Sequence, residues 1–303
     1  MWRDAGLIAG LGVGWGLNWP ALKLALGEIP PWTMRAIGFT CAAILMFSAM
    51  RLRGVSVAIP RRHWGRLALV GALSVVTYNL LSAFAQLTAS TSRSAVLSYT
   101  MPIWAVIFAR LFLGEPFDTR RRLGLALGTA GLLALALPLV IRDELSWGLL
   151  FAVGSGVVWA AGSTALKRWP IDATPPVVTA WQIALGAIVT VCGALLLDPF
   201  PPRIPVRWET WAGLGYNIVV GQVFATTIWF TMLHRMPAGT AAIGSLIVPG
   251  IGVIGATLIL GERPTLADWI GLALIVAASA TVLLRPPPVP EATVPSSPRP
   301  TVP

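Results

Sequence analysis

Charged residues are scarce in this chain of 303 residues, since they make up 11% of it and only 12 of them are Asp or Glu. With 56% hydrophobic residues, the sequence has too little polar surface for a water-soluble globule. We therefore expect an integral membrane protein. The formal net charge of +10 does not indicate nucleic-acid binding, because the basic residues lie in short segments between apolar runs, where they orient a membrane protein.

Cysteines and soluble-enzyme motifs are also scarce. The two cysteines, Cys41 and Cys192, each lie inside an apolar run, which supports neither a disulfide framework nor a zinc site. The segment GLGVGW at Gly10 lacks the last glycine of a dinucleotide fingerprint, and neither HExxH nor GxSxG occurs. We expect no cofactor, no metal and no enzymatic activity.

Ten apolar segments are long enough to cross a bilayer core of about 30 Å as helices. They run over residues 5–26, 32–50, 66–87, 93–113, 123–141, 147–167, 175–197, 209–233, 239–260 and 267–285. The tail that follows, residues 286–303, holds eight prolines in 18 residues and no apolar run. It is expected to be disordered in the cytoplasm.

The two halves of the chain resemble each other. Residues 95–127 match residues 242–274 at 14 of 33 positions, including a proline and a Gly-Glu pair, and residues 10–23 match residues 154–167 at seven of 14 positions. Five spans per copy is an odd number, so the second copy enters the membrane from the opposite side. The sequence predicts an all-α integral membrane protein of ten transmembrane helices in two inverted five-helix repeats, residues 1–142 and 143–285.

The basic residues predict the orientation. With a cytoplasmic N-terminus, 15 Lys and Arg residues fall on the cytoplasmic side and seven on the other, so the positive-inside rule places both termini in the cytoplasm. Arg35 and His234 fall near the two surfaces in this arrangement. There they could titrate or bind anions, although a side chain that snorkels to the headgroups is the simpler interpretation.

Acidic residues are missing from the middle of every expected span. An intramembrane carboxylate is the usual proton or cation carrier of coupled transporters. Its absence favours facilitated movement of a neutral or zwitterionic solute.

Inverted repeats are typical of secondary transporters, whose substrate site lies between the halves near the midplane. Aromatic and uncharged polar side chains at helical spacing are expected to face inward, because polar groups cost free energy against lipid. We expect these to line one central cavity: Trp15, Asn18, Tyr78, Tyr99, Trp159, Ser163, Gln182, Gln222 and Ser245. The alternative for each polar residue is that it joins helices together. Pro102 and Pro249, which match in the repeat, are expected to be hinges.

The motifs resemble the drug/metabolite transporter superfamily, and in particular its ten-helix EamA-type members with two inverted five-helix repeats. The resemblance spans residues 5–285 and rests on four stretches: GWGLNWPALK with VVWAAGSTALKRW, and AVLSYTMPIWAVIFARLFLGE with AAIGSLIVPGIGVIGATLILGE. Within this family the chain is most similar to the YddG-type exporters of aromatic amino acids. That similarity implies substrate contacts at Tyr78, Tyr99 and Trp159.

The resemblance implies an exporter in the bacterial inner membrane that moves amino acids, aromatic or large neutral ones, by alternating access. The expected partners are a small-molecule substrate and membrane lipid, and ten helices could enclose a cavity in a monomer. The alternatives are a proton-coupled exporter of other metabolites or drugs, a channel, and an intramembrane enzyme.

Overall fold

The computed structural model describes residues 2–89, 91–115, 119–141, 147–199, 204–263 and 265–283, and within these ranges every regular element is a helix. The helices are α1 (Trp2–Gly16), α2 (Asn18–Leu26), α3 (Pro31–Leu52), η1 (Arg61–His63), α4 (Trp64–Gly71), η2 (Ala72–Thr77), α5 (Tyr78–Thr88), α6 (Thr91–Ser98), α7 (Met101–Leu113), α8 (Thr119–Ile141), α9 (Trp147–Arg168), α10 (Pro175–Leu197), α11 (Trp208–Tyr216), η3 (Asn217–Ala225), α12 (Thr226–Arg235), α13 (Ala238–Gly244), α14 (Ile247–Leu260) and α15 (Leu266–Leu283). The expected tail, residues 286–303, lies outside the described residues.

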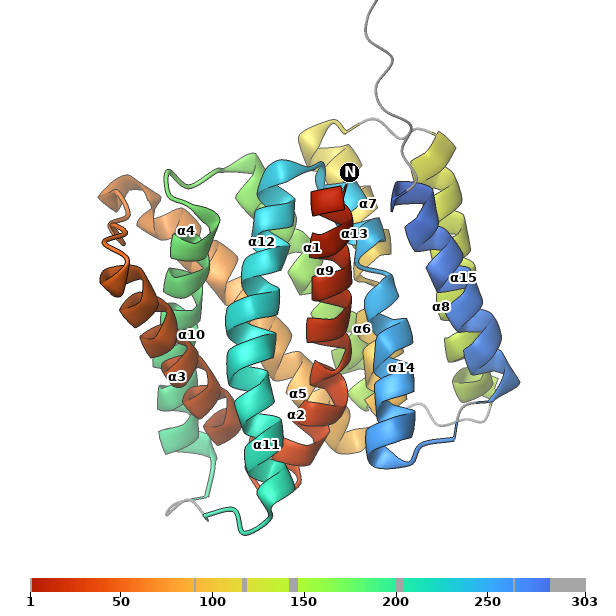
Figure 1. Cartoon of the computed structure of the whole chain (residues 1–303), viewed down its shortest axis with the longest axis horizontal. Helices are drawn as coiled ribbons and strands as arrows, with labels where there is room; N and C mark the ends of the chain where they lie inside the picture. Colours follow the sequence, from red (N-terminus) through yellow and green to blue (C-terminus); the bar gives the residue numbers. More distant parts are fainter. Residues whose placement is uncertain are drawn as a thin grey trace, which may run out of the picture.

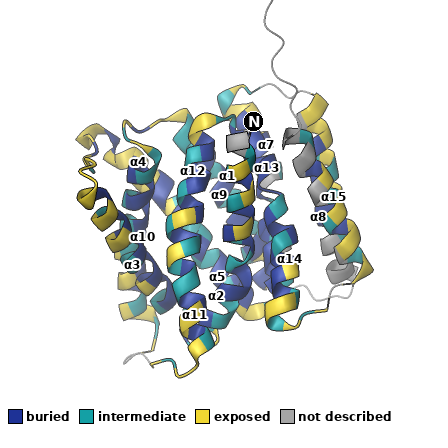
Figure 2. Cartoon of the chain, viewed as in Figure 1, coloured by how far each residue is buried: buried dark blue, intermediate teal, exposed yellow. Residues whose placement is uncertain are grey.

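Length and composition make the chain a multi-pass membrane protein. Six helical stretches within the described ranges are long and apolar enough to cross a membrane: Pro31–Leu52, Arg61–Thr88, Trp147–Arg168, Pro175–Leu197, Trp208–Arg235 and Thr240–Leu260. Large apolar side chains on the outside are exposed, such as Leu196 at 81% and Leu258 at 79%. Figure 2 shows buried residues along the middle of the bundle and many exposed ones on the outer helices. This pattern suits a lipid environment, in which the exterior is apolar.

Helices from the two halves pack against one another in pairs. α3 lies against α10 at one edge of the bundle, and α8 lies against α15 at the other edge (Figure 1). Between these edges, α1 packs on α14 while α9 packs on α6 and α7, and α2 contacts α11 while α9 contacts α5. Within the described residues, helices from the two halves of the chain therefore interlock and do not form two separate globules.

Two long helical stretches carry a π-helical segment at corresponding places. Arg61–Thr88 and Trp208–Arg235 are 28 residues each and contain η2 and η3 near their middles. A π segment displaces carbonyls from their regular acceptor positions, and such segments occur often at functional sites. In η3, the Gly221 carbonyl accepts hydrogen bonds from the Thr226 hydroxyl at 3.0 Å and from Trp15 Nε1 at 3.3 Å.

The prolines expected as hinges do not interrupt helices. The chain turns before them, at residues 99–100 and 245–246, and Pro102 and Pro249 lie in the first turns of α7 and α14. A proline in a first turn loses no intrahelical hydrogen bond, because the N–H groups there have no acceptor in the helix. The backbone changes direction at the two turns, and the prolines start the helices that follow.

The repeated Gly-Glu pairs end α7 and α14 in the same way. Gly114 and Gly261 have φ angles of 66° and 71°, a left-handed conformation that glycine adopts readily at a helix C-terminus. The N–H of the next residue then bonds back to the helix, to the Ala109 carbonyl at 3.2 Å in α7 and to the Ala256 carbonyl at 3.4 Å in α14.

Each glutamate of these pairs reaches the start of a helix in the other half. Glu115 accepts a hydrogen bond from the Ala238 N–H at 2.9 Å, at the start of α13. Glu262 accepts one from the Ser92 hydroxyl, near the start of α6. A carboxylate is favourable there, because the N-terminus of a helix carries a partial positive charge. The repeated motif thus joins the two halves reciprocally.

Two lysines that match in the repeat make matching contacts at opposite ends of the bundle. Lys23 Nζ donates to the Gln86 carbonyl at 2.7 Å, and Lys167 Nζ donates to the Leu233 carbonyl at 2.8 Å and to the Met236 carbonyl at 2.6 Å. Both lysines therefore satisfy carbonyls near the C-terminus of a neighbouring helix, where a positive charge is favoured.

Two acidic residues 144 positions apart also make matching contacts. Glu28 accepts a hydrogen bond from the Thr210 hydroxyl at 2.6 Å, and Asp172 accepts one from His63 Nε2 at 2.9 Å. Asp172 also pairs with Arg62 at 2.6 Å. Each carboxylate joins the first loop of one half to the third long helix of the other.

Replacing Asp172 by Asn is expected to lower thermal stability slightly at neutral pH. The hydrogen bonds from His63 and Arg62 hold the pKa of the Asp172 carboxyl below its usual value. A carboxyl whose pKa is lower when folded stabilises the protein above its unfolded pKa of about 4, and this contribution disappears as the pH falls through the folded value. Unfolding midpoints of the two proteins in detergent should therefore converge below about pH 4. A difference between the two unfolding midpoints that stays constant down to pH 3 would contradict the ion-pair explanation.

Candidate functional site

Five aromatic rings meet in the middle of the bundle. The Trp159 ring lies 5.1 Å from Trp15, 4.6 Å from Tyr78, 5.8 Å from Trp229 and 6.1 Å from Phe230, measured between centroids. These rings come from α1, α5, α9 and α12, so both halves contribute. Trp159 and Trp229 are 2% and 1% exposed. The cluster forms a flat-sided apolar wall of the kind that binds aromatic or large apolar groups.

A small polar cavity adjoins this wall. It measures about 30 Å³ and is lined by Trp15, Asn18, Trp19, Leu22, Arg35, Tyr78, Asn79, Ser82, Trp159, Gln222 and Thr226. A volume of this size holds one or two water molecules. The structure therefore has a small central site that joins aromatic faces to hydrogen-bonding groups.

The polar side of the cavity is a connected network. Gln222 Nε2 donates to Asn79 Oδ1 at 3.0 Å, and Arg35 Nε donates to the Asn79 carbonyl at 3.1 Å. Arg35 Nη2 donates to Ser82 Oγ at 3.3 Å. Three long helical stretches are tied together in this way, which holds the polar groups in place.

Several donors at the site have no acceptor among the described residues. The indole Nε1 atoms of Trp159 and Trp229 and the Nη1 atom of Arg35 are buried and make no hydrogen bond there. Leaving a buried donor unpaired costs free energy of about 1–3 kcal/mol. Such donors are available to a bound solute.

The structure brings together five of the nine residues expected to line a central cavity. Trp15, Asn18, Tyr78, Trp159 and Gln222 all border it. The repeat partners Trp15 and Trp159 are in edge-to-face contact, which agrees with their expected position between the halves.

The other four expected residues lie elsewhere. Tyr99 is buried in the apolar core at the turn between α6 and α7, and Ser245 donates to the Ala242 carbonyl at 2.7 Å beside the turn that precedes α14. Gln182 is fully buried against Gly71, and Ser163 is buried on α9 without bordering the cavity. These polar groups lie in helix contacts, which is the alternative that the sequence left open.

Arg35 lies deeper in the bundle than its place near the end of an expected span predicts. It is 1% exposed and borders the central cavity, whereas a surface position was expected. Its nearness to the end of a span suggested snorkelling. The rotation of α3 about its own axis turns the side chain toward α5 instead, and no sequence pattern revealed that rotation.

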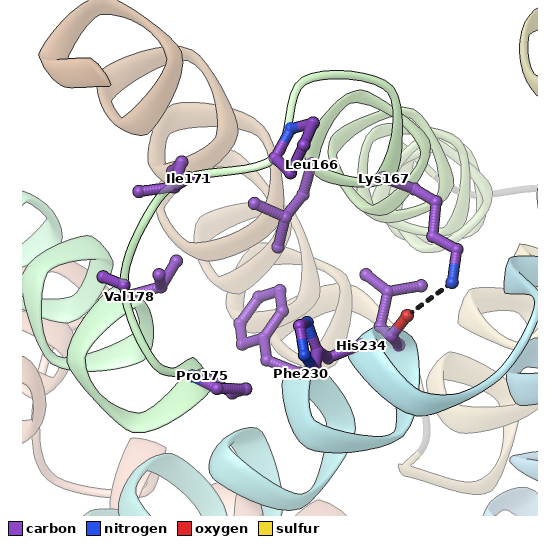
Figure 3. A pocket seen from close by; sticks show the side chains of 10 residues that line it. Leu166, Lys167, Ile171, Pro175, Val178, Phe230 and His234 are labelled. Carbon is purple, nitrogen blue, oxygen red and sulfur yellow. Dashed lines mark hydrogen bonds between the residues drawn. The ribbon is translucent and has the colours of Figure 1, made fainter. Parts of the chain in front are cut away.

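A larger apolar vestibule of about 250 Å³ lies between α9, α10 and α12 at one end of the bundle. Figure 3 shows Leu166, Ile171, Pro175, Val178 and Phe230 around it. Lys167 and His234 also line it, and the Lys167 bond to the Leu233 carbonyl is drawn dashed. Phe230, which borders the vestibule, packs against Trp159, which borders the central cavity.

The opposite end of the bundle is packed closed at the corresponding place. Leu22, Ala25, Ile29, Met34 and Leu214 form a buried apolar cluster there. At an offset of 144, the positions of Leu22 and Met34 correspond to Leu166 and Val178, which line the vestibule. The equivalent positions therefore border a vestibule at one end and belong to a buried apolar cluster at the other.

Comparison with known proteins identifies a family of transporters. The model of the EamA-like transporter family matches residues 4–137 and again residues 146–284. The aromatic amino acid exporter YddG of Ancylobacter novellus is 27% identical over 278 residues, which cover 89% of this chain and 95% of that protein. A riboflavin transporter of Rhizobium johnstonii is 27% identical over 274 residues, which cover 85% and 86% of the two chains.

The fold also matches a solved structure. A protein crystal structure aligns with a TM-score of 0.72 at 20% identity, covering 91% of this chain and 98% of the other. At that identity the match supports the fold alone.

Proposed function

Because this chain belongs to the EamA-like transporter family, we propose that it exports amino acids, aromatic or large neutral ones, across the bacterial inner membrane by alternating access. The central site carries the proposal, since it sets a wall of five aromatic rings beside a cavity with amide, hydroxyl and guanidinium groups. An aromatic amino acid has the same two parts. The similarity to YddG supports the same substrate class.

Ten transmembrane helices in two inverted repeats, 1–142 and 143–285, are part of the proposal. It is supported by three reciprocal pairs of contacts: those of Lys23 and Lys167, of Glu28 and Asp172, and of Glu115 and Glu262. Each pair relates positions 144 or 147 apart, which are the offsets of the sequence repeat. Such reciprocity is expected when two copies face each other across a pseudo-two-fold axis.

The vestibule at one end of the bundle and the buried apolar cluster at the other support alternating access. In the proposed cycle, the cluster at Leu22 and Met34 opens while the surfaces around Leu166 and Val178 close. The turns at residues 99–100 and 245–246, with Pro102 and Pro249 just after them, are the proposed pivots. In transporters that are built from two inverted repeats, the two halves exchange conformations during the transport cycle.

Both termini are proposed to be cytoplasmic. The N-terminus and the end of α15 lie at the same end of the bundle as the end of α12 (Figure 1). Arg51 in the last turn of α3 is exposed, and so are Arg53, Arg61 and Arg62, which follow this helix. The positive-inside rule assigns an end rich in such residues to the cytoplasm.

Purified protein in liposomes should equilibrate labelled phenylalanine without an imposed pH gradient, and the rate should saturate. No carboxylate borders the central cavity among the described residues, so no proton carrier of the usual kind is available there. Uptake that occurs only with a pH gradient would overturn the uncoupled mechanism and favour a proton-coupled exporter. Flux that does not saturate would indicate a channel.

A second candidate is the export of other metabolites, which the similarity to the riboflavin transporter supports. Riboflavin and phenylalanine both present a flat ring to an aromatic wall, but only phenylalanine carries a carboxylate. Competition between labelled phenylalanine and unlabelled riboflavin in the same liposomes separates the two. Strong competition by riboflavin, with none by other amino acids, would favour the second candidate.

A further inference from the structure

Arg35 is a buried cation at the central site. Its side chain comes from the second turn of α3 and is almost fully shielded from solvent. Two of its nitrogens donate to α5, Nε to the Asn79 carbonyl and Nη2 to the Ser82 hydroxyl. The third, Nη1, has no acceptor among the described residues although it is buried.

The charge of Arg35 has no counter-ion in the part of the chain that the structure describes. Its two acceptors are uncharged, and it forms no ion pair there. A buried charge is costly unless it is paired, and inside a membrane such a charge marks a functional site. The network around Arg35 therefore lacks an anion.

The two sides of the cavity indicate the chemistry of the ligand that supplies this anion. Arg35 lies at the polar side of the cavity, and Tyr78, Trp15 and Trp159 line the same cavity with rings. A guanidinium presents donors in a planar fork that matches a carboxylate. A ligand that fits both sides has a carboxylate at one end and an apolar ring at the other.

The repeat does not duplicate this charge. The position that corresponds to Arg35 at an offset of 144 is Thr179, whose hydroxyl donates to the Pro175 carbonyl of its own helix at 2.8 Å. A structural element needed by both halves would be expected in both. One guanidinium at one side of a nearly symmetric site instead orients a ligand.

We propose that Arg35 binds the carboxylate of the transported solute and makes a carboxylate a requirement for recognition. This inference rests on the proposed function and narrows it: phenylalanine is accepted, whereas its amide and its decarboxylated amine are rejected. The cavity of about 30 Å³ is too small for such a solute. Binding therefore accompanies opening toward the vestibule at Phe230.

Ligands that share the phenyl ring but differ in whether they carry a carboxylate test the proposal on the unmodified protein. Thermal unfolding in detergent is followed with phenylalanine, 3-phenylpropanoate, phenylalaninamide and phenethylamine, and the same compounds compete with labelled phenylalanine in liposomes. A charged hydrogen bond contributes enough to change affinity by about 10- to 100-fold. The two carboxylates should bind more tightly than the amide and the amine by that factor.

Variants of two arginines on α3 then test whether Arg35 causes the preference for carboxylates. Arg35→Gln should remove the preference for carboxylates, and Arg35→Lys should keep part of it because the charge remains. Arg51→Gln is the matched control, since Arg51 is exposed on the same helix and should retain the full preference.

Each outcome decides something different. Carboxylate-dependent stabilisation that requires Arg35, without phenylalanine transport, would support the Arg35 site and refute the proposed function. Phenylalanine transport with equal competition by the amide would overturn the Arg35 site and leave the function standing. If Arg35→Gln keeps the full preference for carboxylates, the Arg35 site is likewise overturned and the proposed function still stands. If no carboxylate binds or competes, the Arg35 site is wrong.

Discussion

Replacing Trp159 by Ala is expected to abolish transport. Its ring is the one that contacts all four others in the central cluster: Trp15, Tyr78, Trp229 and Phe230. A solute ring that packs on Trp159 gains about 0.5–1.5 kcal/mol for each aromatic contact, in addition to the apolar area that it buries. Losing the wall should therefore lower the transport rate at limiting substrate by about 100-fold or more. The measurement is the initial rate of labelled phenylalanine uptake into liposomes.

A loss of folding has to be separated from a loss of binding, because removing a buried tryptophan costs about 3–5 kcal/mol. Trp159→Phe keeps a ring in the cluster and loses the unpaired indole donor and part of the ring volume, so it should fold and retain partial activity. Trp147→Ala is the matched control, since Trp147 starts the same helix and is 73% exposed. Normal flux in a folded Trp159→Ala variant would show that the substrate site lies elsewhere.

Replacing Gly156 by Ala is expected to destabilise the protein by about 1–3 kcal/mol. A Cβ at this position would lie 2.8 Å from the Ser98 carbonyl, 2.9 Å from the Thr100 hydroxyl and 3.0 Å from the Met101 nitrogen. Two of these are backbone atoms of the turn between α6 and α7, and they cannot rotate away. The midpoint of thermal unfolding in detergent measures the effect.

Gly154 on the same helix is the control. A Cβ there would lie 3.5 Å from one methyl group of Leu81, which is an ordinary contact. Gly154→Ala should therefore be neutral or stabilising by up to about 1 kcal/mol, because alanine favours a helix. Equal losses for the two variants would contradict the close approach at residues 98–101.

The glycines also explain part of the sequence repeat. Gly12, which matches Gly156, faces the other turn, since a Cβ on it would lie 2.7 Å from Ile247. In each half, a glycine of the first helix thus lies close to a turn of the other half. Gly156 of α9 approaches the turn between α6 and α7, and Gly12 of α1 approaches the turn between α13 and α14. Ile247 is contacted through a side chain, so Gly12→Ala should be tolerated better than Gly156→Ala.

Much of the fold could be predicted from the sequence because the relevant signals are local or repeated. Apolar length places the membrane segments, and helix covers most of each of the ten expected ones, from residues 5–26 to 267–285. The sequence itself also shows that no carboxylate lies at the centre of an expected membrane segment. The repeated Gly-Glu pairs marked helix ends, since a left-handed turn at Gly114 or Gly261 follows from residue type.

The site was only partly predictable, because a polar residue in an apolar segment faces the protein interior without revealing which part of it. Gln222 and Gln182 look equivalent in sequence, yet Gln222 joins the cavity network and Gln182 packs against Gly71. The π segments η2 and η3 change which direction the side chains face in the second part of each long helical stretch. No residue pattern in the sequence predicted these segments.

Sequence alone determined that this protein is a helical membrane protein with a duplicated plan and without acids inside its spans, since hydropathy and identity are properties of the chain itself. Tertiary structure decided which side chains share the central cavity. It also decided that Arg35 is buried among uncharged partners and that a vestibule lies at one end of the bundle. Those features depend on how helices far apart in sequence rotate and pack against one another, and that packing exists only in the folded bundle.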